Sequence, residues 1–535
     1  MSPASLLLLG ALVGGSGALC DSVVDTAAAL FRSGQVEEAE ATLVQAVERC
    51  PRHPEILAEL AALRFQQGRY EEAAVLADRY VELAPESGWG WNLLGASRYL
   101  AGQSVGALEA WNRLDRPRVD AVDWGRTEPE VVRRLRPTIG LPEGGVLTPE
   151  ELVRARRLLE DLPALARSAI AYGPTGEGRV RIRVSADTGP RAPLSLHTFP
   201  AHLARALRGG VRLTSSGALG RLDHWELAGE TEGSLDLLRV AVALPLGSGG
   251  DIHRWEVSGT RGQFQVSREG GPESVRRRGV RWEYQRRDLS WIRIGSLLGM
   301  DDRAATGMSL VAGGVVAMDI LEPREGASRG SVGWQVETHH PVGSGGSSLD
   351  PRRFARVAVH VQARWPFGST GGPIGGPTGL PPWEVEARGG VDAISEHAPP
   401  DLRPRFGADR SANRLLRAHS AVDSEGVVRN LLPGTGWLSG GVEVRRWGSG
   451  PIGGLLGAAV FADGATRLAH GRHPTPRARE GRIDTGAGLR LRLPGIGGHL
   501  RLDWATSLRD GGSRFSAAWV GFHQQTGSAW TGSGP

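Results

Sequence analysis

A spacing of 34 residues dominates the first part of this 535-residue chain. Three sets of residues recur at this step: Gly34, Gly68 and Gly102; Ala39, Ala73 and Ala107; Phe31, Phe65 and Tyr99. A unit of this length holds two helices, because the glycine breaks the chain between them and the alanine lets them approach closely. The spacing therefore predicts a stack of helical hairpins, in which each unit is stable only when it packs on its neighbours.

This pattern resembles the tetratricopeptide repeat, which has two antiparallel helices in each unit. We assign three repeats to residues 20–116, about the minimum for a stable stack. The third repeat is irregular, because Pro117 stands two positions earlier than the spacing requires. The resemblance implies an all-α solenoid that binds peptides or scaffolds partners and has no catalytic role.

The first 19 residues have the pattern of a secretory signal peptide. An apolar run from Leu6 to Val13 precedes small residues that would allow cleavage near Ala18. Cys20 begins the first helix of the repeats and Cys50 ends the second, so an antiparallel hairpin would make them neighbours and allow a disulfide. The alternative is a lipid on Cys20, for which Leu19 is a poor preceding residue. Either interpretation predicts an oxidising compartment outside the cytoplasm.

Residues 117–188 have a different pattern. A short strand at Val119–Trp124 leads into a helix around Thr127–Leu135, and a second helix begins at Thr148. Two further strands follow, at Arg167–Tyr172 and Arg179–Ser185. This β-α-α-β-β order resembles a POTRA domain, the periplasmic module that precedes outer-membrane assembly and secretion barrels. The resemblance implies client binding by strand addition; an unrelated small α+β domain is the alternative.

From residue 189 to residue 523, glycines separate short segments of the chain, and much of the total of 77 glycines lies in this region. The segments between turns alternate in polarity: Leu235–Leu246, Ile252–Val257, Arg278–Tyr284, Ser290–Gly295, Phe354–Trp365, Trp383–Val391, Gly440–Arg446, Gly486–Leu493, Leu500–Trp504 and Phe515–Phe522. At about 20 residues per strand and connection, this region predicts a transmembrane antiparallel β-barrel of roughly 16 strands. A soluble β-sandwich or propeller is the alternative, and residues 524–535 form a C-terminal tail.

Tryptophan is common in this region and stands near the ends of several segments. These copies are Trp291, Trp365, Trp437, Trp447 and Trp519. Their placement is typical of an aromatic girdle at a bilayer interface. No run of 18 apolar residues occurs in the chain, which excludes a helical membrane protein.

Two short motifs near the C-terminus give the most specific resemblance. Phe461-Ala-Asp463-Gly464 is similar to a Phe-x-Asp-x-Gly strand motif of the POTRA–barrel superfamily, and Leu416-Arg417-Ala418-His419 is similar to its Val/Leu-Arg-Gly-aromatic loop motif. Phe515, Trp519 and Phe522 follow the pattern of its terminal strand signal. That superfamily comprises outer-membrane protein insertases and two-partner secretion transporters.

The resemblance implies that the loop folds back into the lumen and that Arg417 pairs there with Asp463. A guanidinium fork on a shielded carboxylate would hold such a loop firmly. Ala418 and His419 depart from the glycine and the aromatic residue of the motif, so the loop tip is expected to pack differently. The alternatives are a solvent-facing arginine and an aspartate in an ordinary turn.

No enzymatic site and no cofactor site is recognisable. All 63 basic residues are arginine, so a phosphate-binding loop with its lysine is impossible. His339-His340 lies in a loop-like stretch with no third metal ligand at a suitable spacing. The arginines are spread evenly instead of gathering beside aromatic residues, which argues against nucleic-acid binding.

These features together predict an outer-membrane protein of a Gram-negative bacterium, with its repeats and POTRA-like domain in the periplasm. The function that the resemblance implies is insertion or translocation of unfolded client polypeptides, with a periplasmic protein partner on the repeats and outer-membrane lipid around the barrel. Two alternatives stay open: an export pore for polysaccharide, and a structural anchor for a periplasmic complex.

Overall fold

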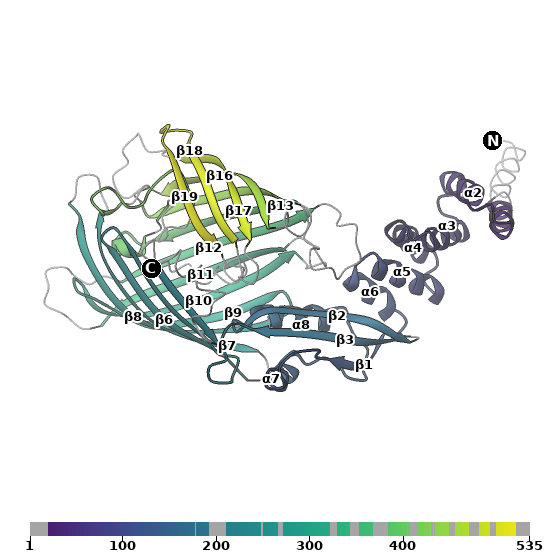
Figure 1. Cartoon of the computed structure of the whole chain (residues 1–535), viewed down its shortest axis with the longest axis horizontal. Helices are drawn as coiled ribbons and strands as arrows, with labels where there is room; N and C mark the ends of the chain where they lie inside the picture. Colours follow the sequence, from purple (N-terminus) through teal and green to yellow (C-terminus); the bar gives the residue numbers. More distant parts are fainter. Residues whose placement is uncertain are drawn as a thin grey trace, which may run out of the picture. The chain divides into compact units, whose positions relative to one another are not determined.

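The structure is a computed structural model, shown in Figure 1. It describes residues 20–176, 178–191, 210–247, 250–265, 271–321, 329–342, 353–367, 383–403, 405–406, 415–429, 432, 434–448, 455–469, 481–492 and 499–520. The predicted signal peptide, the C-terminal tail and Phe522 lie outside these residues. The chain divides into two compact units, Met1–Asp123 with Leu141–Val153 and Ala171–Ile182, and the remainder.

The repeats form paired helices, as the spacing predicts. A first helix over residues 20–32 is followed by α2 (Val36–Arg49), α3 (Pro54–Gln66), α4 (Tyr70–Leu83), α5 (Gly88–Leu100) and α6 (Ser104–Asn112). Gly34, Gly68 and Gly102 stand in the turns between paired helices with φ of 82°, 74° and 80°, a left-handed conformation that favours glycine. A disulfide joins Cys20 to Cys50.

Residues 118–188 follow the expected order of elements. They form β1 (Arg118–Asp123), α7 (Pro129–Ile139), α8 (Pro149–Asp161), β2 (Leu165–Gly176) and β3 (Arg179–Thr188), with a sheet order of β1-β3-β2. At the start of α8, the Thr148 amide donates to the Glu151 carboxylate and the Glu151 amide donates to Oγ1 of Thr148, which is a capping box. The helix expected at Thr127–Leu135 instead runs from Pro129 to Ile139, because Gly140 with φ 60° ends it.

A sheet of 16 strands occupies residues 210–520. Its strands are β4 (Gly210–Ser216), β5 (His224–Glu232), β6 (Leu235–Leu246), β7 (Asp251–Gln265), β8 (Glu273–Leu289), β9 (Ile292–Arg303), β10 (Gly307–Leu321), β11 (Arg329–Pro341), β12 (Phe354–Phe367), β13 (Trp383–Ile394), β14 (Val428–Arg429), β15 (Gly436–Trp447), β16 (Leu456–Ala469), β17 (Arg482–Arg492), β18 (His499–Ser507) and β19 (Ser513–Val520). Each pairs antiparallel with its neighbour in the chain, except that β15 pairs with β13 and the short β14 pairs in parallel with β7. The strands curve around a common interior in Figure 1.

The two faces of this sheet differ sharply. Val257, Val280, Met300 and Leu310 are paired across successive strands and are all exposed on the outer face. The inner face instead buries charge, on residues such as Arg281, Asp301, Glu337, Glu443, Arg445, Asp463, Asp484, Arg490 and Asp503. Because side chains alternate between faces along a strand, each strand contributes to both surfaces.

Three expectations were wrong. Trp437 and Trp447 are not in an outer girdle: both are buried on the inner face, where Trp437 donates its indole N–H to the Leu432 carbonyl. Trp447 lies under the Arg492 guanidinium. The proximity of these tryptophans to strand ends does not reveal which face they occupy. His339-His340 lies within β11 and not in a loop, because alternation across Gln335–His339 continues the strand.

No helix in the part of the chain that the structure describes is long and apolar enough to cross a membrane. Among the described residues, no group of three or more histidine, cysteine or acidic side chains is arranged to hold a metal ion.

Helix packing in the third repeat generates a stability prediction. A Cβ added to Gly95 would lie 2.4 Å from Nε1 of Trp111, so Gly95→Ala forces the indole to move. We expect this overpacking to lower the free energy of unfolding of the repeats by about 1–3 kcal/mol, measured by urea denaturation followed by helical circular dichroism. In the same helix Gly88→Ala is the control, because its Cβ would meet only Leu114 at 3.6 Å. Equal effects of the two substitutions would contradict this packing.

Candidate functional site: an arginine-tipped loop inside the sheet

The chain between β13 and β15 folds back over the inner face of the sheet. Among its described residues are a short 3-10 helix at Pro400–Leu402, a turn at residues 416–418 and β14. Leu416 has a left-handed φ of 59°, and its carbonyl accepts a hydrogen bond from the His419 amide at 3.0 Å. This tight turn carries Arg417 at its tip; we call residues 415–419 the loop tip.

Arg417 is surrounded by carboxylates from three strands. Its Nε lies 2.8 Å from Oδ2 of Asp463 on β16, and its Nη1 lies 2.9 Å from Glu443 on β15 and 3.1 Å from Asp503 on β18. The guanidinium also stacks over the Phe461 ring, 3.7 Å from its centre. Arg417 is only 1% exposed, so these contacts act in an environment where water screens them little.

Further arginines on the strands balance these carboxylates. Arg490 on β17 contacts Glu443 and Asp503, each at 2.7 Å, and Arg445 on β15 contacts Glu443 at 2.5 Å. Removing a single member would leave buried opposite charges with one partner fewer, and breaking a buried ion pair by removing one partner costs about 3–5 kcal/mol. The loop tip is thus one member of a network of ion pairs that joins β15 to β18.

A second aspartate holds the backbone of the loop tip. Asp484 on β17 lies directly opposite Asp463 in the register of the sheet. Its Oδ2 accepts a hydrogen bond from the Ala418 amide at 2.7 Å and lies 3.0 Å from Nδ1 of His419. Asp463 therefore binds the side chain of Arg417, and its cross-strand neighbour Asp484 binds the backbone of Ala418.

His419 connects the loop tip to the turn between β18 and β19. Its Nε2 lies 3.0 Å from Asp510 of that turn and 2.7 Å from Arg482. His419 stands on the loop, outside the strands, and its pKa is raised, mainly by the hydrogen bond to Asp484, although burial and Arg482 oppose the shift. The hydrogen bond between His419 and Asp510 lowers the pKa of the Asp510 carboxyl.

Glycines on the strands leave room for this network. A Cβ on Gly441 would lie 2.4 Å from Oδ1 of Asp463, and a Cβ on Gly488 would lie 2.2 Å from Oδ1 of Asp503. Both positions face the inner side, where the carboxylates and Arg417 occupy the volume that a side chain would fill. Part of the glycine content is therefore a requirement of the site.

The loop also reaches the opposite part of the sheet. β14 pairs with β7, and Val428 packs with Leu235 and Phe264 in a small apolar cluster. The Gly426 carbonyl accepts a hydrogen bond from the Ser234 amide in the turn between β5 and β6 at 2.7 Å. A larger apolar cluster joins further described residues of this segment to strands of the sheet: Phe354, Ile394, Ala398, Leu402, Phe406, Leu415, Leu416, Leu432, Trp437 and Ala465. The segment between β13 and β15 therefore contacts the inner face at β15–β18 and again at β5–β7.

The structure brings together most of the residues singled out by the two motifs. Arg417 and Asp463 are in contact, Phe461 lies beneath Arg417, Leu416 is buried beside the tip, and Ala418 and His419 meet Asp484. Gly464, in contrast, pairs with Gly440 and Ile483 and lies away from the loop tip. Phe515 is exposed on the outer face, and Trp519 lies within β19.

Four charged residues of this site were not predicted from the sequence: Glu443, Asp484, Asp503 and Arg490. Glu443, Asp503 and Arg490 lie in segments that were predicted as strands from their alternating polarity. Alternation predicts which face of the sheet a side chain occupies, but it does not predict which side chain it contacts. Asp484 lies just before the predicted segment at Gly486–Leu493, within the true strand β17. Charged residues at every second position, as in Glu443-Val-Arg445, were the signal that could have marked a buried ionic face.

Known proteins are similar to this chain in two respects. Residues 30–96 match the family described as tetratricopeptide repeat. No curated protein sequence matches the chain at a significant level. Among similar solved structures is the crystal structure of BamA from Haemophilus ducreyi lacking POTRA domains 1-3, with a TM-score of 0.41 and 12% identity, over 75% of this chain and 84% of that chain.

The space left by Gly441 generates a test of the loop anchor. Gly441→Ala places a methyl group against Asp463 and should displace Arg417, so trypsin should cleave after Arg417 at least about tenfold faster in the folded protein. Cleavage after Arg429, whose side chain is 54% exposed, serves as the internal reference. Gly464→Ala is the control, because its Cβ comes no closer than 3.6 Å to another residue. Equal protection of Arg417 in both variants would contradict the described packing.

The histidine contacts generate a pH prediction. Because the folded pKa of His419 is raised, its stabilising contribution is complete below the ordinary pKa of an imidazole and is lost as the pH rises through the folded value. Tryptic protection of Arg417 should therefore weaken from mildly acidic to mildly alkaline pH, after correction for the activity of trypsin on the Arg429 bond. In His419→Gln this pH dependence should disappear. A wild-type protection that strengthens with pH would refute the assignment.

Proposed function

We propose that this chain is an outer-membrane β-barrel protein that mediates insertion or translocation of client polypeptides. In this proposal the helical repeats and the small α+β domain lie in the periplasm, where they bind a protein partner and extended clients. The observation that carries the proposal is the loop tip, held by a buried ionic network inside a sheet whose outer face is apolar.

The outer face supports a membrane location. Its exposed apolar residues include Leu238, Val257, Leu298, Val336, Val357, Val361, Leu438, Val460, Leu489 and Trp504. In water such a surface is unfavourable, whereas in lipid it needs no partner. The strands from β5 to β18 in the main order of the sheet each pair with a neighbour on both sides, which satisfies backbone groups without water. Arginine and acidic residues on the inner face complete the apolar-out, polar-in pattern of outer-membrane barrels.

The anchored loop supports a polypeptide client over a polysaccharide. A passive export pore needs an open interior, whereas here the segment between β13 and β15 contacts the inner face at two separate groups of strands. A fixed loop inside the sheet is compatible with a client that is inserted beside the barrel. Such a route uses backbone pairing at strand edges, which does not require an empty lumen.

The N-terminal elements supply the binding surfaces. The match to the tetratricopeptide repeat supports protein–protein interaction through the helices of residues 30–96. In the three-stranded sheet β2 is an edge strand, 12 residues long, and an extended client can pair with such an edge. The resemblance of residues 117–188 to a POTRA domain supports this role for β2.

Depletion of the chain tests the proposed function. We expect loss of outer-membrane proteins or secreted proteins from their normal location, measured by quantitative mass spectrometry of membrane and culture fractions. Loss of surface polysaccharide with both proteomes unchanged would favour the export pore instead. Loss of a periplasmic complex alone would favour the structural anchor.

Substitution of Arg417 tests the role of the loop tip. Arg417→Ala leaves three buried carboxylates without this partner, so client insertion or secretion should fall at least about tenfold while the protein still reaches the membrane. Arg417→Lys should restore part of the activity, because it keeps the charge but not the planar fork. Arg429→Ala, at an exposed position of the same loop, is the control. Full activity of Arg417→Ala would refute a functional role for the loop tip.

A further inference from the structure

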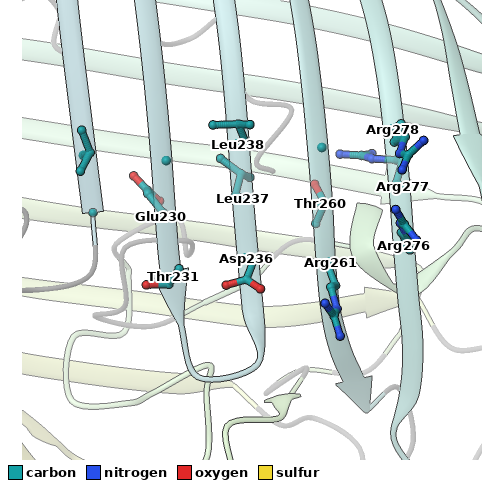
Figure 2. A pocket seen from close by; sticks show the side chains of 14 residues that line it. Glu230, Thr231, Asp236, Leu237, Leu238, Thr260, Arg261, Arg276, Arg277 and Arg278 are labelled. Carbon is teal, nitrogen blue, oxygen red and sulfur yellow. The ribbon is translucent and has the colours of Figure 1, made fainter.

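A groove of about 690 Å³ lies over β4–β8, near the end of the sheet where β5 turns into β6. Figure 2 shows Asp236, Arg261 and Arg276 on neighbouring strands beside this turn. Gly229 and Gly259 line the groove without side chains, and a Cβ on Gly259 would meet no atom within 4 Å. The groove is therefore open space above the sheet that a bound molecule could fill.

Three arginines on the outer face line this groove. Arg261 on β7 and Arg276 and Arg278 on β8 are exposed, and they alternate with Thr260 and Arg277, which are buried toward the interior. Arg277 is held inside by Asp401 at 3.3 Å. For the three outward arginines, no ion pair with a described residue occurs, so their charge is available to a ligand.

Two acidic residues line the groove, but only Asp236 shares the outer face, because Glu230 stands opposite the buried Leu237 and belongs to the inner face. Asp236 stands opposite Arg261 in the register of β6 and β7. On β9, the exposed Asp302 stands opposite Arg278, so three outward guanidinium groups face the carboxylates of Asp236 and Asp302 and leave a net positive charge. The excess favours an anion, and Arg278 stands opposite Gly259, which has no side chain to occupy the space beside it.

Apolar residues continue the groove toward the middle of the sheet. Leu238 lines it and is 57% exposed, and Val257 and Val280 follow on the same outer face, two residues from Gly259 and Arg278. A molecule lying here meets arginines at one end and an apolar surface along its length. That arrangement matches an amphiphile with an anionic head and hydrocarbon chains.

We propose that this groove binds the phosphate-bearing headgroup of a membrane lipid, with Arg261, Arg276 and Arg278 on the phosphate and the acyl chains along Leu238, Val257 and Val280. The inference rests on the proposed membrane location of the outer face and goes beyond the proposed function. A phosphate monoester is the best match, because its second negative charge gains from several guanidinium groups at once.

Native mass spectrometry of the detergent-purified full chain tests this site, with phosphatidic acid and phosphatidylcholine as the probes. We expect the wild-type protein to retain one phosphatidic acid at a concentration at least about tenfold below that needed for phosphatidylcholine. The triple variant Arg261→Gln, Arg276→Gln, Arg278→Gln should lose this preference. Arg286→Gln is the matched control, because Arg286 is an exposed arginine toward the opposite end of β8.

A second variant keeps the arginines. Gly259→Leu fills the groove without a clash at Cβ and should also abolish the preference for phosphatidic acid. Equal retention of the two lipids by the wild-type protein, or an unchanged preference in both groove variants, would overturn the proposal. Complete displacement of phosphatidic acid by inorganic phosphate would also overturn it, because the site would then bind a soluble anion.

Flotation of the same proteins with phosphatidylcholine vesicles separates this proposal from the proposed function. A wild-type protein that does not enter the vesicles refutes the membrane location, and with it both proposals. A wild-type protein that enters vesicles but shows no preference for phosphatidic acid refutes the headgroup site alone. Entry by wild type and triple variant alike, with the preference lost only in the variant, supports both.

Discussion

The burial of Arg417 among Asp463, Glu443 and Asp503 is the interaction on which the interior of the sheet depends. Desolvating so many charges is costly, and only mutual pairing offsets that cost. The arrangement tolerates few substitutions, because Glu443 and Asp503 are each shared by more than one arginine. Arg417, Arg445 and Arg490 in turn each contact more than one carboxylate. The position of the loop is consequently specified by electrostatics as well as by the apolar cluster around Leu416.

Arginine suits this interior for a physical reason. Its guanidinium is planar, stays charged and donates in several directions, so one side chain can satisfy carboxylates on different strands. Arg445 shows this, with contacts to Glu384 and Glu443 at 2.7 and 2.5 Å. A lysine would offer a single point charge in the same place. The chain has arginine and no lysine, which is compatible with an interior in which each cation pairs with several carboxylates.

Sequence alone predicted the periodic parts of the structure well. The 34-residue spacing predicted the helix pairs, because close helix packing requires the same small residues in each repeat. Alternating polarity predicted strands such as β6 and β12. Alternating polarity did not predict β4, β5, β10 and β11, where glycines and charged residues interrupt the alternation. The contact between Arg417 and Asp463 came from a motif resemblance, but Asp484 and Asp503 did not, because register across strands decides which carboxylates converge.

The segment between β13 and β15 has a mechanical consequence. Its tip is held at β15–β18 and its other end at β5–β7, so it acts as a strut between two arcs of one curved sheet. A strut of this kind resists flattening of the cross-section and transmits displacement from one arc to the other. Bending the strands near the loop tip must therefore move the strands at β5–β7, or break a contact at one end of the strut.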